Sequence, residues 1–293
     1  MIEARPSLTA LMVAKRRAAH QLFDAEPLVL NDPIAVPIIG DAAKAELLAD
    51  PMKQRSMIAR AGRALVVARS RYAEDQLATA VRRGVRQYVV LGAGLDTFAY
   101  RDPFPPRTLR VFEVDHPATQ AWKRERLRAA GITLPPQLTF VDVHFERQSL
   151  ADRLRESGFD PFSPAFFSWL GVTMYLTNEA IDSTLAFIAS RPAGSGIALD
   201  YSLPSASLNW LERVIRAYFK RKVRRMGEPF ITHFTPEGMR ALLERHGYTG
   251  IEDLGHEALN ARYFSGRSDG LFVGGHSLRV VSAWVQNDTG RER

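Results

Sequence analysis

A short apolar run that ends in a glycine turn constrains the fold of this chain most. Residues 88–91 are rich in β-branched side chains, which is typical of a parallel strand buried on both faces. Gly92-Ala93-Gly94 follows at once and predicts a turn that tolerates no bulky side chain. Ligands of parallel sheets bind beside such turns, at the carboxyl ends of the strands. An ordinary strand-to-helix turn is the alternative interpretation, since a lone G-x-G also arises by chance.

The next predicted strand supports a nucleotide-type cofactor. It covers residues 109–114 and is followed by Asp115, which lies 21 residues after Gly94. This is close to the separation of about 20 residues at which a carboxylate binds the ribose hydroxyls of a cofactor. Thr97 replaces the third glycine, which allows close helix–strand packing beside a pyrophosphate. We therefore expect a nucleoside cofactor without phosphates, and S-adenosylmethionine is the first candidate.

Alternating strand and helix patterns predict the fold class from residue 84 onward. The apolar runs expected to form strands are residues 88–91, 109–114, 138–141, 165–170, 196–201, 250–254 and 278–285. Helical patterns separate them, one beginning with Pro117 and another with Thr235-Pro236. This alternation is typical of an α/β fold with a mostly parallel sheet and helices on both faces.

Two further segments flank or interrupt this pattern. Residues 1–83 are expected to be a helical cap over the cofactor side of the sheet, with a long helix at 57–81. Residues 84–293 are expected to form the cofactor-binding core, which makes one structural domain overall. The insertion at 203–234 is a candidate lid. Its amphipathic stripe consists of Leu208, Leu211, Ile215, Tyr218 and Phe219.

Three motifs resemble the leucine carboxyl methyltransferase-like family, in its polyketide O-methyltransferase branch. They are V-V-L-G-A-G-L-D-T at 89–97, F-E-V-D-H-P at 112–117 and F-F-S-W-L-G-V-T-M-Y-L at 166–176. The resemblance, which runs from residue 57 to 254, implies a Rossmann-like class I methyltransferase with seven strands, the last one antiparallel. It also implies S-adenosylmethionine as cofactor and transfer of its methyl group to oxygen. Phe98 departs from the arginine usual in the family, and Leu170 from a glutamate near the cofactor.

The resemblance also assigns residues to the cofactor. It implies that Asp115 binds the ribose, although a helix cap is the other role open to it. Asp142 is expected to accept from the adenine amino group, with the N–H of Val143 on a ring nitrogen; a turn or cap aspartate is the alternative. Arg69 resembles the arginine that pairs with the methionine carboxylate, and Arg71 is the fallback. The remaining predicted cofactor contacts are Gly92, Ala93, Gly94 and Leu170.

Candidates for direct contact with the methyl acceptor are few. Tyr175 follows the fourth predicted strand, and His233 lies where the family places pocket-lining residues; a core tyrosine and a lone histidine are the alternatives. Asp96 and Arg101 are expected to pair and brace the glycine turn. The histidines show no spacing of a zinc motif, so no metal is expected.

Charge and composition narrow the class of partner. The net charge of +7 and a pI of 9.8 favour an anionic small-molecule acceptor, a carboxylate or a phenol. The basic block at 220–225 is also compatible with nucleic acid, but it lacks interleaved aromatic residues, so we expect neither nucleic acid nor a membrane as partner. No apolar run has the length of a membrane span or signal segment, which predicts a cytoplasmic location. The oligomeric state is not predicted.

Two other functions remain as alternatives. An NAD-dependent oxidoreductase is opposed by Thr97 in place of the third glycine. A non-catalytic protein that binds S-adenosylmethionine is favoured only by Leu170 in place of glutamate. The prediction is therefore an S-adenosylmethionine-dependent O-methyltransferase.

Overall fold

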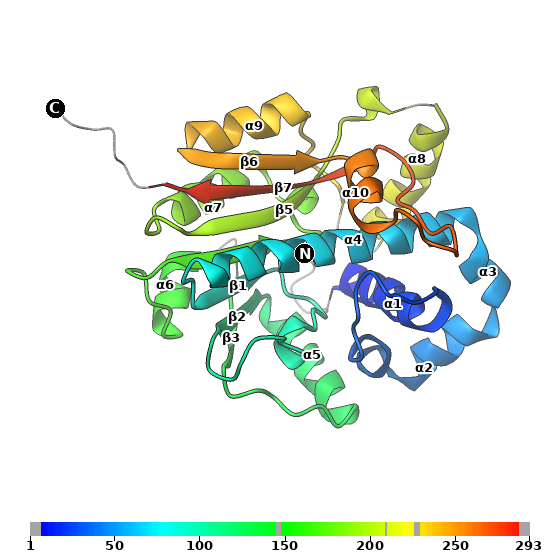
Figure 1. Cartoon of the computed structure of the whole chain (residues 1–293), viewed down its shortest axis with the longest axis horizontal. Coiled ribbons are helices and arrows are strands. Elements are labelled where there is room, and N and C mark those ends of the chain that lie inside the picture. Colours follow the sequence, from blue (N-terminus) through cyan, green and yellow to red (C-terminus); the bar gives the residue numbers. More distant parts are fainter. Residues whose placement is uncertain (1–6, 145–147, 209, 226–228, 287–293) are drawn as a thin grey trace.

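The computed structural model describes residues 7–144, 148–208, 210–225 and 229–286, and they contain one sheet of seven strands (Figure 1). Its order is β3-β2-β1-β4-β5-β7-β6, and β7 runs antiparallel to the other six strands. The bounds are β1 (Gln87–Leu91), β2 (Arg110–Asp115), β3 (Leu138–Asp142), β4 (Ala165–Trp169), β5 (Gly196–Ser202), β6 (Tyr248–Leu254) and β7 (Leu278–Val285). The seven predicted strands and the antiparallel last strand are confirmed.

The helices of the described segments surround this sheet. They are α1 (Leu8–Phe23), α2 (Ala35–Ala49), α3 (Pro51–Arg55), α4 (Met57–Arg82), α5 (Pro117–Ala129), α6 (Leu150–Glu156), α7 (Asn178–Ala189), α8 (Trp210–Arg225), α9 (Pro236–Arg245) and α10 (His256–Tyr263). Short 3₁₀ turns lie at η1 (Phe98–Tyr100), η2 (Thr173–Tyr175) and η3 (Ser205–Ser207). In these segments, no helix combines the length and the apolar character that crossing a membrane requires.

Short polar side chains fix where several helices begin. Ser7, Ser56 and Thr177 each accept a hydrogen bond from the N–H three residues further on, at 3.1, 3.3 and 3.2 Å. Thr235 does the same for α9 at 3.1 Å, and Pro236 follows it as the first helical residue. These bonds satisfy N–H groups that have no partner inside the helix, which explains why the breaks in the sequence pattern coincide with helix ends.

The sheet is buried on both faces, as the apolar character of β1 predicts. Tyr88 and Val90 point toward α4, which crosses one face (Figure 1). Val89 and Leu91 point to the other face, where they join a core with α6, α7 and α9. All five residues of β1 are buried. This central position fixes the turn that follows β1 as a rigid part of the molecule.

The N-terminal helices form a third core beside the carboxyl ends of the strands. Ala18 of α1 and Ile38 of α2 pack with Leu127 of α5 and with Leu95, which follows the glycine turn. α1 thereby lies directly over the turn, and a Cβ atom added at Gly94 would be 3.0 Å from the Cβ of Ala10. The division into a cap of 1–83 and a core of 84–293 stays a prediction.

The insertion at 203–234 contains η3 and α8. Leu208 of the predicted apolar stripe is buried, whereas the side chains of Leu211, Ile215, Tyr218 and Phe219 lie outside the described residues. α10, which the sequence analysis did not identify, packs Leu259 into the core beneath α4. Its sequence carries both apolar and polar residues without a helical period, so no stripe marked it in advance.

Candidate functional site

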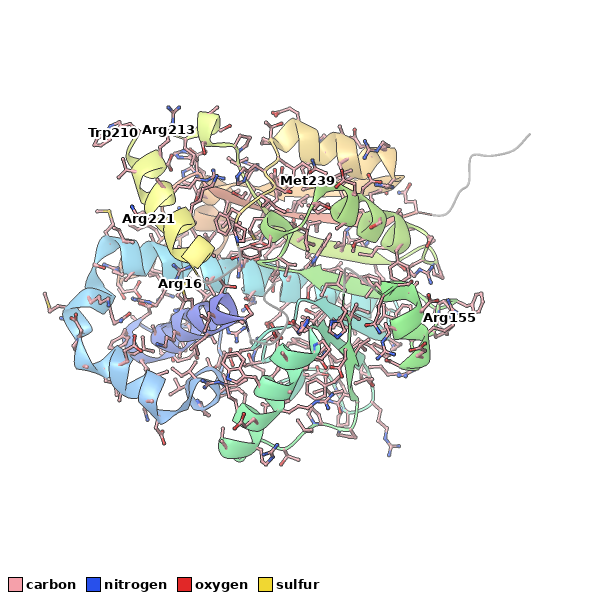
Figure 2. All side chains as sticks on the ribbon, turned by 180° about the vertical axis from the view of Figure 1, so that it is seen from behind. Arg16, Arg155, Trp210, Arg213, Arg221 and Met239 are labelled. Carbon is pink, nitrogen blue, oxygen red and sulfur yellow. The ribbon has the colours of Figure 1, made fainter. Side chains whose placement is uncertain are left out.

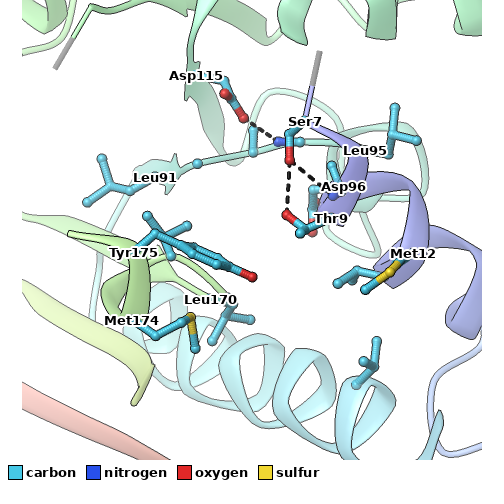
Figure 3. Close-up of a pocket in the computed structure, with 18 of the residues that line it drawn as sticks. Ser7, Thr9, Met12, Leu91, Leu95, Asp96, Asp115, Leu170, Met174 and Tyr175 are labelled. Atoms are coloured by element: carbon cyan, nitrogen blue, oxygen red, sulfur yellow. Dashed lines mark hydrogen bonds between the residues drawn. The ribbon is translucent and has the colours of Figure 1, made fainter. Parts of the chain in front are cut away.

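A cavity of about 340 Å³ lies at the carboxyl ends of β1, β2 and β4, and α1 and α4 form its far wall (Figure 3). Its volume is within the range of about 300–1,000 Å³ of small-molecule sites. The predicted site residues in its lining are Arg69, Gly92, Ala93, Gly94, Asp115, Leu170 and Tyr175. The sheet thus brings seven sequence-predicted residues from five segments to one place.

The glycine turn has a backbone that only glycine adopts easily. Gly92 and Gly94 have φ angles of 68° and 49°. A Cβ atom at Gly92 would also lie 2.4 Å from Cγ2 of Val172, closer than two carbon atoms approach. The predicted turn is therefore confirmed, and its main chain forms part of the cavity wall.

Asp115 ends β2 with its carboxylate held by the main chain. Oδ2 accepts from the N–H of Gly94 and Oδ1 from the N–H of His116, each at 2.6 Å. A carboxylate oxygen has two acceptor sites, and this carboxylate lines the cavity. Two vicinal hydroxyls, such as those of a ribose, match this arrangement. The helix-cap role belongs instead to His116, whose Nδ1 accepts from the N–H of Ala118 at 3.3 Å.

Arg69 lies in a buried ion pair that borders the cavity. Its Nη1 is 2.5 Å from Oδ2 of Asp200, and the N–H of Gly171 donates to Oδ1 of the same carboxylate at 2.5 Å. A Cβ atom at Gly171 would be 2.8 Å from Nη2, so this glycine makes room for the guanidinium. Nε of Arg69 is buried with no hydrogen-bond partner among the described residues. Arg69 therefore fits the binding of a ligand carboxylate, whereas Arg71 is half exposed and pairs with Asp75.

The predicted pair of Asp96 and Arg101 is wrong. Arg101 instead binds Glu74, with Nη1 donating to Oε2 at 3.0 Å, and its Nε lies 3.4 Å from Asp32. Asp96 faces Arg17 at 3.7 Å. Arg101 pairs with Glu74 and Asp32 because both are more deeply buried than Asp96. A less solvated carboxylate attracts the guanidinium more strongly. The glycine turn is still braced, since Asp32 accepts from the hydroxyl of Thr97 at 2.7 Å.

α1 contributes cavity residues that the sequence analysis missed. Thr9, Met12 and Arg16 of this helix line the cavity, together with its N-cap residue Ser7. Met12 and Arg16 are one turn apart and so share a face, but this spacing does not by itself reveal what the face covers. Arg16 lies over Gly62, where an added Cβ would be 3.3 Å from Cζ. Burial and the nearby Arg69 lower the pKa of Arg16 to about 10, which leaves it charged at neutral pH.

The predicted adenine contacts fit the structure less well. The N–H of Val143 donates to the carbonyl of Asp115 at 3.0 Å, which extends the β2–β3 pairing and uses the donor assigned to a ring nitrogen. That assignment of Val143 is corrected accordingly. Among the described residues His144 lines the cavity at this end of β3, with its ring 4.7 Å from that of His116, and Asp142 and Val143 do not. The role of Asp142 stays a prediction.

The two positions that depart from the family have different surroundings. Phe98 is buried, and its ring meets that of Tyr88 edge to face at 5.0 Å, so an aromatic contact takes the place of an arginine. Leu170 follows β4 and adds an apolar surface to the cavity. Tyr175 ends η2 beside Phe230, at 5.2 Å between ring centroids, and Figure 3 shows its hydroxyl directed into the cavity.

His233 does not belong to this cavity, which corrects its prediction as a pocket-lining base. Its Nδ1 lies 2.8 Å from Nη2 of Arg216, and its Nε2 lies 3.1 Å from Nζ of Lys220. Burial and these two cations lower the pKa of His233 to about 4. In the described part of the chain no three side chains are placed to hold a metal ion.

Comparisons with known proteins identify the family of this chain. The family model of leucine carboxyl methyltransferase matches residues 10–189. The "Putative S-adenosyl-L-methionine-dependent methyltransferase YktD" of Bacillus subtilis is 35% identical over 291 residues, which cover 90% of this chain and 93% of that protein. A protein of Mycobacterium marinum with the same description is 35% identical over 203 residues, covering 66% of this chain and 65% of its own length.

Solved structures show the same fold at low sequence identity. A protein of Thermobifida fusca YX, described as a putative methyltransferase, is similar with a TM-score of 0.54 at 16% identity and 96% coverage of both chains. A duf574 family protein of Streptomyces avermitilis gives a TM-score of 0.51 at 16% identity, covering 92% of this chain and 96% of its own. The chain therefore belongs to the leucine carboxyl methyltransferase family, and it is a methyltransferase whose cofactor is S-adenosylmethionine.

Proposed function

We propose that this methyltransferase methylates an oxygen atom of an anionic small molecule, a carboxylate or else a phenol. The observation that carries the proposal is Arg16, a cation in the wall of the cavity in addition to Arg69. If Arg69 holds the carboxylate of the methionine part, Arg16 provides positive charge for a second anion. An acceptor that is already ionised also needs no general base, and the candidate base His233 lies outside the cavity.

The residues of the chain would act mainly by positioning. Asp115 would hold the ribose and Arg69 the methionine carboxylate, each through charge-assisted hydrogen bonds. The cofactor supplies an electrophilic sulfonium methyl group when it is bound. Arg16 would bring the acceptor oxygen into line with that group, because alignment removes much of the entropic barrier. Apolar side chains, among them Met12, Leu170 and Met174, would exclude water from the reacting oxygen.

Tyr175 has a place in this proposal as a contact to the acceptor. Its hydroxyl points into the cavity, and a phenol can donate a hydrogen bond to one carboxylate oxygen while the other is methylated. Tyr175→Phe should therefore raise KM for the acceptor more than it lowers kcat.

The test combines the protein with S-adenosylmethionine that carries an isotopically labelled methyl group and with a pool of small metabolites. Labelled products are separated by mass and then treated with mild alkali. A methyl ester releases labelled methanol, and an aryl ether keeps its label. Label on nitrogen, on carbon or on an unactivated alcohol would contradict the proposal, although the protein would remain a methyltransferase.

A further inference from the structure

A second group of cations lies beneath α8, behind the wall of the cavity. Arg216 is buried, and its Nη2 lies 2.8 Å from Oγ of Ser202 and 2.8 Å from Nδ1 of His233. Its Nη1 donates to the carbonyl of Leu203. Lys220, one turn further along α8, places Nζ 3.1 Å from Nε2 of His233. Two cations and an imidazole thus meet in one partly buried space.

α8 places two of its charged side chains against the protein, which is unusual for a surface helix. Arg216 and Lys220 face the protein, while Trp210 is 75% and Val214 60% exposed. Arg221 is exposed as well, and Figure 2 shows it with Trp210 on α8 at the edge of the molecule. Removing charges from water has a free-energy cost that is recovered only through partners in the protein or in a ligand.

The partners present do not balance these donors. Both ring nitrogens of His233 face a cationic N–H group, and Nδ1 also lies 3.2 Å from Oγ of Ser202, but a neutral imidazole has only one acceptor nitrogen. Within the described segments, no ion pair joins Arg216 or Lys220 to a carboxylate. Burial lowers the pKa of both, and for Lys220 the charge of Arg216 adds to this effect. Among the described residues the group therefore has more hydrogen-bond donors than acceptors, and no carboxylate compensates its charge.

The group adjoins the cavity through three residues that line it. Val223 follows Lys220 by one helical turn. Leu278 of β7 is paired with Ser202 of β5 in the sheet register, and Phe230 precedes His233 by three residues. The cationic group thus lies on segments of the chain that also line the cavity.

We propose that Arg216, Lys220 and His233 form an oxyanion-binding site that takes a carboxylate or phosphate group. An oxyanion supplies the acceptors that the group lacks and neutralises its charge, and Arg216 and Lys220 are both suited to such ligands. The bound group is a part of the methyl acceptor other than the oxygen that receives the methyl group. This last step rests on the proposed function; the binding of an oxyanion does not.

The experiment titrates the full chain with inorganic phosphate and, separately, with acetate, at constant ionic strength. The ring signals of isotope-labelled histidines report binding, and His233→Gln identifies the signal of His233. We expect a saturable change of that signal. The anion that binds more tightly, phosphate or acetate, indicates whether the acceptor carries a phosphate or a carboxylate group. Saturation with S-adenosylhomocysteine should leave this binding in place, because Arg69 belongs to the other site.

Matched variants on one helix make the test specific. Lys220→Gln should weaken binding of the anion by about tenfold or more, and Lys220→Arg should retain most of it. Arg221→Gln removes the same charge from the exposed face and should change the affinity by less than about twofold. Absence of a saturable change with both anions, equal weakening by Lys220→Gln and Arg221→Gln, or displacement by S-adenosylhomocysteine would each overturn the proposal. Failure of S-adenosylhomocysteine itself to bind would count against the proposed cofactor contacts, and the phosphate titration would still decide this site.

Discussion

Two buried arginines approach β5 from different helices and meet opposite conditions there. Arg69 of α4 pairs with Asp200, whereas Arg216 of α8 contacts Ser202, two residues further along the same strand. The first cation is neutralised within the fold. The second shares its surroundings with Lys220 and with His233, which has a lowered pKa. The comparison indicates that a ligand at Arg69 must compete with an internal carboxylate, while a ligand at Arg216 would supply the missing charge.

The same difference predicts opposite effects on stability. A cation with a buried counter-ion stabilises the fold as long as both partners remain, so the loss of one leaves a costly charge behind. A cation beside other cations opposes folding through repulsion and desolvation. Substitutions at Arg69 and near His233 should therefore separate a site that supports the fold from one that serves a ligand.

The largest effect is expected from Arg69→Met. It leaves the carboxylate of Asp200, which is fully buried, without its counter-charge, and should lower the free energy of unfolding by about 3–5 kcal/mol. Denaturation with urea measures this loss. Adding Asp200→Asn to the same chain should recover a large part of it, because the unpaired charge is then gone.

Arg71→Met is the matched control for this change, since Arg71 lies on the same helix and pairs with Asp75 near the surface. An exposed pair four residues apart contributes about 0.3–0.5 kcal/mol. Equal losses of unfolding free energy in the two variants would show that the pair of Arg69 and Asp200 stabilises the fold no more than an exposed pair does.

The second largest effect is expected on the affinity for the demethylated cofactor, S-adenosylhomocysteine. Asp115→Ala removes acceptors for the predicted ribose hydroxyls. It should weaken the binding of S-adenosylhomocysteine by about 1.5–3 kcal/mol, or roughly ten- to a hundredfold in affinity. Calorimetry measures the affinity. Because Asp115 also holds the N–H of Gly94, Asp115→Asn serves as a companion that keeps the size and one acceptor. Unchanged affinity in the alanine variant would rule out the ribose assignment.

The sequence predicted the fold well, and it also predicted the glycine turn at the carboxyl end of β1. Strand and helix boundaries follow from local signals: β-branched runs, prolines in first turns and capping hydroxyls. The parallel sheet then brings Gly94 and Asp115 together, since Asp115 ends β2 and Gly94 follows the end of the neighbouring strand β1.

The contacts of the arginines and of His233 could not be predicted from the sequence, because long-range packing creates them. Arg16 reaches the cavity only because α1 folds back over the glycine turn, 78 residues or so away in sequence. The pairing of Arg69 with Asp200 spans 131 positions, and no local pattern encodes it. The placement of His233 failed similarly, since its surroundings depend on which side of α8 faces inward.

A third, smaller effect tests whether the insertion at 203–234 is a lid. Amide hydrogen exchange in this segment should be faster than in β5 in the free protein, because α8 has few of its described side chains buried. Addition of inorganic phosphate with S-adenosylhomocysteine should slow the exchange of α8 by about tenfold, since ligands that bind the closed form stabilise it. Strong protection throughout the free segment would exclude a lid that orders on binding.

The smallest effect is a pH dependence that belongs to the cationic group. The pKa of His233 is lowered from its ordinary value of 6.5 to about 4 in the folded chain. Between these values the unfolded chain binds a proton that the folded chain does not, so protonation of His233 lowers stability as the pH falls from 6.5 toward 4. Above pH 6.5 the full stability is present.

His233→Gln should lose less unfolding free energy over this interval in denaturation experiments, after the pH dependence due to the carboxylates of both proteins is subtracted. Inorganic phosphate should reduce the difference between the two proteins, because a bound oxyanion favours the protonated imidazole and raises its pKa. If stability changed with pH equally in the two proteins, His233 would not be repelled by the neighbouring cations. The contrast between Arg69 and Arg216 would then lose this support.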